Sequence, residues 1–183
     1  ERTFWVGTKG NGILKIYDYE FDKNISDCRA EVLTTSNSAL SSNAVYCFAK
    51  SHRNLLWIGD EEGLTYYSYR EKRIKSIPIR IGNEDFKYIH DIYETADSEL
   101  WLVSVGMGVV KARIAGTPDN PVIVDAQRYI INDGELGSNY FFTIYAENEA
   151  NLLFGNKGYG VFRYKETTNG LEPVSTHKYE NMT

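Results

Sequence analysis

Short runs of apolar and aromatic residues alternate with polar residues along the whole chain, and glycine-containing turns separate them. A period of two over about four to eight residues is typical of half-buried β-strands, whereas an amphipathic helix repeats every three to four residues. Helical periodicity is not sustained over ten or more residues in any segment. The pattern therefore predicts an all-β protein.

One group of residues recurs four times: an aromatic residue in a strand, then a glycine turn, then a further strand. The aromatic residues are Trp5, Trp57, Trp101 and Phe154, spaced 52, 44 and 53 residues apart. A repeat of about 40 to 50 residues is typical of a β-propeller blade, which is a four-stranded antiparallel sheet. Because stacked blades bury the faces that one small sheet leaves open, we expect all four to be structural anchors between blades.

Each later anchor is preceded by a strand-like run, in residues 40–48, 86–94 and 136–145. Third strands are expected at 13–17, 64–69, 109–114 and 161–164, and fourth strands at about 30–34, 74–79, 123–129 and 174–178. The chain is predicted to be a single propeller segment with blades at 1–38, 39–82, 83–133 and 134–183. The first blade lacks its innermost strand. We expect the remaining blades to lie in the same natural chain, or two copies to form a homodimer through open sheet edges.

Composition and charge argue against several classes of binding partner. Hydrophobic residues make up 42% and charged residues 25%, which is a globular composition. The net charge of −5 gives no electrostatic reason to expect nucleic acid or an anionic membrane as a partner, because both require a basic face. No apolar run approaches the roughly 18 residues that span a bilayer, so direct membrane contact is not expected. Cys28 and Cys47 form no CxxC motif, which argues against zinc. They are either free thiols or a pair formed in an oxidising compartment.

The clearest copy of the repeat lies in residues 40–64, where Leu-Ser-Ser-Asn is followed by Val-x-x-Phe, Asn-Leu-Leu-Trp-Ile-Gly and Gly-Leu. This pattern resembles the two-component regulator propeller repeat. The copy at 136–161 has Phe in place of Trp, and the copy at 86–109 has lost the Ser-Asn turn and the Ile-Gly pair. The resemblance implies seven-bladed propellers in the periplasmic sensor region of Bacteroides-type hybrid histidine kinases, many of which detect glycans. It implies that the kinase lies outside this segment.

Residues that suggest catalysis are few. There is neither a nucleophile elbow nor a zinc-binding HExxH helix, and the glycine-rich residues 7–12 lack the following helix that would bind a phosphate. Asp60, Glu61 and Glu62 together provide carboxylates of the kind that bind calcium, but a solvated turn is the simpler interpretation. We therefore predict no catalytic residues, no metal and no cofactor.

A ligand site is predicted where the inner strands begin, because loops cluster there on one face of a propeller. Aromatic rings can stack on the C–H faces of a sugar while amides and charges bind its hydroxyls. His90 and Asp91 should face opposite sides of their strand, one of them toward the axis. An oligosaccharide or other small-molecule signal is the expected ligand. The alternatives are a propeller enzyme, either a lyase or a glycoside hydrolase, and a protein-interaction scaffold. The candidate residues are Asn43, Tyr46, Lys87, Tyr88, His90, Asp91, Asn139 and Tyr140.

Overall fold

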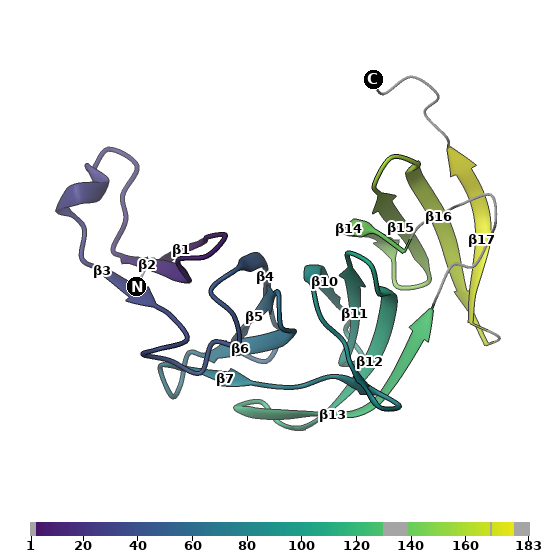
Figure 1. Ribbon diagram of the computed structural model, residues 1–183, viewed down its shortest axis with the longest axis horizontal. Coiled ribbons are helices and arrows are strands. Elements are labelled where there is room, and N and C mark those ends of the chain that lie inside the picture. Colours follow the sequence, from purple (N-terminus) through teal and green to yellow (C-terminus); the bar gives the residue numbers. More distant parts are fainter. Residues whose placement is uncertain (1–2, 130–138, 169, 178–183) are drawn as a thin grey trace.

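The computed structural model describes residues 3–129, 139–168 and 170–177, and it is built from antiparallel sheets (Figure 1). The all-β prediction is confirmed. Four of the sheets, called blades 1 to 4 here, follow one another along the chain. Blade 1 is β1 (Thr3–Gly7), β2 (Ile13–Tyr17) and β3 (Ala30–Leu33). Blade 2 is β4 (Val45–Lys50), β5 (Leu55–Asp60), β6 (Leu64–Ser68) and β7 (Arg73–Ser76). Blade 3 is β10 (Ile89–Glu94), β11 (Glu99–Ser104), β12 (Gly108–Thr117) and β13 (Asn120–Tyr129). Blade 4 is β14 (Phe141–Asn148), β15 (Asn151–Asn156), β16 (Gly160–Thr167) and β17 (Gly170–His177).

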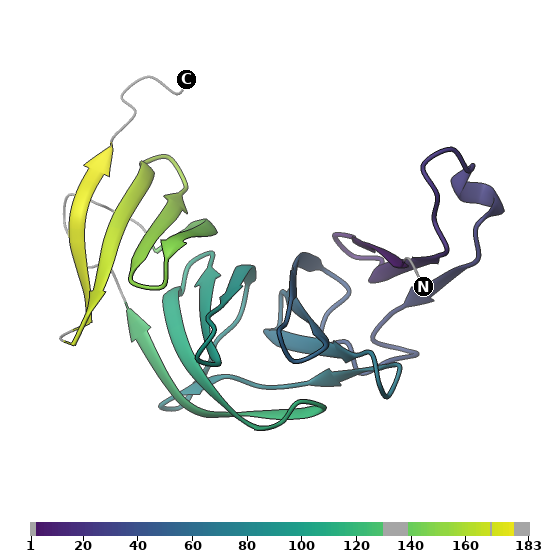
Figure 2. The same ribbon diagram turned by 180° about the vertical axis from the view of Figure 1, so that it is seen from behind.

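The blades stand side by side around an arc, as propeller blades do (Figures 1 and 2). The innermost strands β4, β10 and β14 face the concave side, and strands within each blade pair in sequence order. Blade 1 contains three strands among the described residues, so β1 forms its edge. Residues 136–138 of one expected inner strand and Lys178 of one outer strand lie outside the described residues. The number of blades in the natural protein stays a prediction.

Two small elements were not predicted. A two-stranded hairpin, β8 (Arg80–Ile81) and β9 (Glu84–Asp85), connects blades 2 and 3, and a short 3-10 helix η1 (Ile25–Asp27) connects the outer strands of blade 1. In the described part of the chain, no helix has the length and apolar character needed to cross a bilayer.

The hydrophobic core consists of three clusters, one between each pair of neighbouring blades. Trp57 is completely buried between blades 2 and 3, where its Nε1 donates to Glu94 Oε2 on the next inner strand (2.9 Å). Trp101 is completely buried between blades 3 and 4. Trp5 is only partly buried and packs against the cluster between blades 1 and 2. Each tryptophan therefore faces the blade that follows it in the chain.

Phe154 is buried but does not occupy the tryptophan position. Trp101 lies opposite Tyr93 of the inner strand, and the residue that lies opposite the corresponding Tyr145 is Leu153. Phe154 therefore lies one position later, on the face that turns back to blade 3, where it packs against Trp101. The prediction that Phe154 is equivalent to the tryptophans is therefore wrong by one position in the strand register, and a shift of one residue places a side chain on the opposite face of the sheet.

Each of the three inner strands contains a β-bulge at the same point. The register shifts between Val45 and Cys47 in β4, and at the equivalent place in β10 and β14. The bulged residue is unpaired, and a bulge redirects the side chain it carries. This extra residue explains why the phase of the inner strands cannot be read from simple alternation.

Both cysteines are free. Cys47 lies on the inner strand of blade 2 opposite Gly59, and its Sγ is 3.7 Å from the backbone oxygen of Ile89 in blade 3. Burial raises the pKa of this thiol well above its ordinary value. Cys47 therefore packs at the junction of two blades, in surroundings that disfavour its thiolate form.

Candidate functional site

Three aromatic side chains from successive blades form a row on the inner strands. They are Tyr46, His90 and Phe142, and each is the bulged residue of its strand. The Tyr46 and His90 rings are stacked, with centroids 4.2 Å apart and planes 21° apart. The Phe142 ring meets His90 edge-on at 5.2 Å. Because Phe142 is 44% exposed and its two neighbours are partly exposed, the row presents an aromatic surface to solvent.

The sequence did not predict Phe142 as a site residue. The signal was present, because Phe142 follows Phe141 as His90 follows Ile89, but the fourth inner strand could not be aligned without knowing of its bulge. The structure brings Tyr46 and His90 of the predicted set together and adds this third ring. An equivalent bulge in each of the three inner strands therefore positions the members of the row.

Tyr88 connects the row to the face of the molecule on which the inner strands begin, called the top face here. Its backbone oxygen lies 2.9 Å from His90 Nδ1. Its backbone nitrogen donates to Glu61 of blade 2, and its oxygen accepts from Val105 of blade 3. The residue has a φ of 55°, uncommon for a tyrosine, and its side chain is 41% exposed. Tyr88 is thus held between two blades while its ring is available at the surface.

Asp91 faces blade 4 and not the axis. Its Oδ2 accepts hydrogen bonds from Thr143 Oγ1 (2.8 Å) and from the backbone nitrogen of Ile144 (3.0 Å), and its Oδ1 accepts from the nitrogen of Ile92 (2.9 Å). These bonds tie the inner strands of blades 3 and 4 together. The described contacts of Asp91 are structural, while its neighbour His90 provides the ring in the row.

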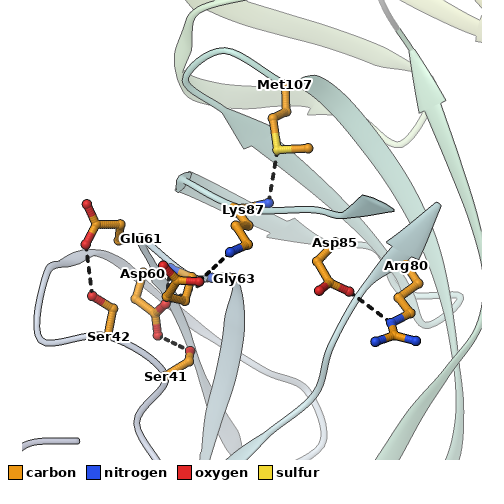
Figure 3. A network of polar contacts seen from close by, with 10 residues as sticks. Ser41, Ser42, Asp60, Glu61, Gly63, Arg80, Asp85, Lys87 and Met107 are labelled. Carbon is orange, nitrogen blue, oxygen red and sulfur yellow. Dashed lines mark hydrogen bonds and ion pairs between the residues drawn. The ribbon is translucent and has the colours of Figure 1, made fainter. Parts of the chain in front are cut away.

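The three acidic residues of the β5–β6 turn have separate partners, as Figure 3 shows. Asp60 is completely buried and accepts from Ser41 Oγ (2.6 Å) and from the backbone nitrogens of Glu62 and Gly63. Burial raises the pKa of Asp60, and these hydrogen bonds oppose the rise. The expected solvated turn is therefore wrong for Asp60, whereas Glu62 is exposed to solvent. In the described ranges, no group of three or more His, Cys, Asp or Glu residues is arranged to hold a metal ion.

Lys87 crosses from blade 3 to this turn. Its Nζ pairs with Glu62 Oε2 at 2.5 Å, and its backbone nitrogen donates to Met107 Sδ (Figure 3). The Glu62 carboxylate raises the pKa of Lys87. Both charged groups remain substantially exposed, so the pair lies at the top face where it can meet a ligand.

The two predicted asparagines serve mainly to join blades. Asn43 accepts from the nitrogen of Thr35 through Oδ1 (2.9 Å), and its backbone oxygen accepts from Gly10 and Gly12 of blade 1. The backbone oxygen of Asn139 makes the equivalent pair of bonds to the β11–β12 turn of blade 3. In blades 2 and 4, the backbone at the asparagine of the repeat therefore attaches the blade to the preceding one.

Tyr140 lies beside Asn139 and is 44% exposed, with Lys157 Nζ 5.9 Å from its ring centroid. The top face thus carries two exposed tyrosines, Tyr88 and Tyr140, each preceding an inner strand. Together with the aromatic row they form a surface suited to stacking and to a few polar contacts. Whether these residues bind a ligand stays a prediction.

Solved structures with the same arrangement of strands include extracellular domains. The chain superposes on the extracellular domain assigned to the hybrid two component system BT4673 of B. thetaiotaomicron with a TM-score of 0.73, at 16% identity and over 94% of its length. It superposes on the corresponding domain of BT3049 with a TM-score of 0.50, at 15% identity and over 99%. It also matches PorZ, a surface component of the type-IX secretion system of Porphyromonas gingivalis, with a TM-score of 0.61, at 14% identity and over 88%.

These likenesses establish the fold. The chain covers only 23%, 28% and 23% of BT4673, BT3049 and PorZ, about a quarter of each. No protein-family model matches the chain, and no curated protein matches it. Because the structures include both sensor domains and a secretion component, function has to be argued from the site.

Proposed function

We propose that this chain is part of the extracytoplasmic sensor region of a two-component signalling protein and contributes to binding a small ligand, a glycan or its breakdown product, on the top face. The observation that carries the proposal is the continuous aromatic row Tyr46–His90–Phe142, which runs across three successive inner strands. The resemblance of the repeat to sensor propellers supports it. So does the fold shared with two extracellular domains of hybrid two-component systems.

Aromatic surfaces suit the C–H faces of sugar rings, and nearby polar groups suit sugar hydroxyls. The pair Lys87–Glu62 and the exposed ring of Tyr88 lie next to the row on the same face. A ligand bound there would contact more than one blade, and it would signal only if it bound one state of the sensor more tightly than the other. Binding without catalysis is therefore the proposed activity.

The test is the thermal stability of the complete extracytoplasmic region of the natural protein, measured with and without a panel of oligosaccharides. A rise in the midpoint that depends on concentration is expected for one glycan class. Phe142→Ala should abolish the rise, and Tyr145→Ala should not, because Tyr145 is an exposed aromatic residue on the same strand outside the row.

Three results would count against the proposal. A rise that survives Phe142→Ala would place the ligand elsewhere. The absence of any rise across the panel would favour a protein partner. Turnover of a glycan would favour the enzyme alternative.

A further inference from the structure

A recess lies between blades 1 and 2 on the bottom face, which is the face on which the inner strands end. It has a volume of about 180 Å³. Its walls carry three cations, Lys15, Arg29 and Lys72, and the aromatic rings of Tyr17 and Tyr69. The recess lies at the opposite ends of the strands from the aromatic row, so it is a separate site.

Lys15 is the unusual group of this recess. Its side chain is buried, with the residue only 6% exposed, and its Nζ donates to Tyr67 Oη at 2.7 Å. The Nζ also lies 5.0, 4.6 and 4.4 Å from the ring centroids of Trp5, Tyr17 and Tyr67. Among the residues that the structure describes, no carboxylate is within ion-pair distance of it. Glu31 accepts instead from Tyr17 Oη (2.6 Å).

A buried ammonium is normally compensated by a carboxylate, because removing the charge from water is costly. Aromatic rings compensate only part of this cost. Lys15 thus has hydrogen-bonding and cation–π partners but no direct ion pair within the described part of the chain. Its cross-strand neighbour Glu31 is bonded to Tyr17 instead.

The interface between blades 3 and 4 shows which partners a lysine at this register position can have. Lys111 in blade 3 lies opposite Trp101, as Lys15 lies opposite Trp5, and its Nζ is 5.5 Å from the Trp101 ring. Unlike Lys15, it pairs with two carboxylates, Glu99 Oε2 at 2.6 Å and Glu166 Oε1 at 2.5 Å. The two lysines therefore have the same register position and opposite electrostatic situations.

The strand register identifies the residues that replace those carboxylates. Glu99 lies two positions before Trp101, and Thr3 lies two positions before Trp5. Glu166 lies three positions after the residue opposite Leu153, and the corresponding residue of blade 2 is Tyr69. Thr3 and Tyr69 both line the recess. The space that holds two acidic side chains between blades 3 and 4 is thus bordered by hydroxyl groups between blades 1 and 2.

The remaining interface excludes a general requirement for charge at these positions. Between blades 2 and 3 the three equivalent residues are Tyr66, Leu55 and Ile114, all of them buried and uncharged. The register positions therefore tolerate a sealed, uncharged contact, so a lysine at this position is not a general requirement of a blade interface.

We propose that the recess between blades 1 and 2 binds a small carboxylate, which takes the place of the two missing acidic side chains beside Lys15. Arg29 and Lys72 add positive charge at its rim, and the tyrosine rings favour a ligand with an apolar or sugar-like face. A volume of about 180 Å³ corresponds to about six water molecules, which limits the ligand to roughly the size of one sugar acid. The proposal is independent of the function proposed for the top face.

The test is isothermal titration calorimetry of the natural full-length chain with sodium glucuronate, using glucose as the uncharged control of the same ring size. Saturable binding of glucuronate, with binding of glucose at least tenfold weaker, is expected. Lys15→Met should weaken glucuronate binding at least tenfold. Lys111→Met removes an equal charge from the other interface and should leave the affinity unchanged.

A second variant keeps the test decisive if Lys15→Met does not fold. Thr3→Glu places a carboxylate where Glu99 stands in blade 3, so it should pair with Lys15, weaken glucuronate binding at least tenfold and leave the thermal midpoint unchanged or higher. The proposal is overturned if glucuronate does not bind saturably, if glucose binds equally well, or if either variant retains full affinity. Any of these results would make Lys15 a structural residue compensated by its aromatic neighbours.

Discussion

Adding a single methyl group at Gly59 tests how closely blades 2 and 3 approach each other. A Cβ at this position would lie 2.5 Å from Cys47 Sγ, 2.6 Å from the backbone oxygen of Ile89 and 2.9 Å from Ile89 Cγ2. The first atom belongs to the same blade and the other two to the next one. Because Ile89 is completely buried and its oxygen belongs to an inner strand, relief requires the two blades to separate.

The expected loss of stability follows from these contacts. Overpacking of a well-packed core costs about 1 to 3 kcal/mol, and a backbone obstacle places Gly59→Ala toward the upper end. Replacing glycine at an ordinary φ recovers about 0.4 to 1 kcal/mol by restricting the unfolded chain. A net destabilisation of about 2 kcal/mol is expected for Gly59→Ala.

Gly155 provides the matched control, because it has the same register position in blade 4. There the nearest atom to a new Cβ is Cγ2 of the exposed Thr143, at 2.6 Å, and the nearest backbone atom is 4.0 Å away. Gly155→Ala should therefore change stability by less than about 1 kcal/mol. Urea denaturation measures the free energy of unfolding of both variants, and the two are compared provided that the dependence of this free energy on urea concentration is the same. A Gly155→Ala variant as unstable as Gly59→Ala would refute the reasoning.

Three further predictions concern polar groups in the core. Trp57→Phe leaves the buried carboxylate of Glu94 without its donor and should destabilise by about 2 to 3 kcal/mol in urea denaturation, and Glu94→Gln should recover part of that loss. Trp101 Nε1 is buried and has no hydrogen-bond partner among the described residues, and Ala146 occupies the position of Glu94 in blade 4. Ala146→Gln should therefore raise the free energy of unfolding by about 1 kcal/mol, seen as a higher urea midpoint. An unchanged midpoint would contradict the assignment of Ala146 to the position of Glu94. Because burial raises the folded-state pKa of Asp60, its contribution to stability is present below its ordinary pKa and is lost as pH rises through the raised value. Asp60→Asn should remove this pH dependence. The thermal midpoint of the variant should equal that of the wild type at low pH and should be higher than that of the wild type at neutral pH.

The sequence predicted the strands of the blades because each blade repeats the same order of turns and apolar runs. Trp57 and Trp101 illustrate this, since both mark a second strand and both are completely buried. Phe154 shows the limit of the method. An aromatic residue one position away from the tryptophan site faces the opposite side of the sheet, and spacing alone does not reveal such a shift.

The candidate site was predictable only in part, for a related reason. Tyr46 and His90 could be selected as residues near the start of inner strands, but their contact depends on bulges that align them across blades. Asp91 and Asn43 were chosen for their polarity, and the structure shows hydrogen bonds between blades that the sequence does not encode locally. Nothing in the local sequence distinguishes Lys15, because its environment is formed by residues from two blades.

The three interfaces between successive blades share one backbone geometry but differ in chemistry. The interface of blades 3 and 4 has an ion-paired lysine, that of blades 2 and 3 has uncharged buried side chains, and that of blades 1 and 2 has a lysine without an ion pair among the described residues. Duplication of a blade copies the geometry of its interface, and afterwards only two or three side chains need to change for a sealed contact to become a binding recess. Strand pairing and ring curvature are untouched by such changes. Repetition therefore gives this architecture several equivalent places in which new specificities can evolve, each starting from a stable scaffold.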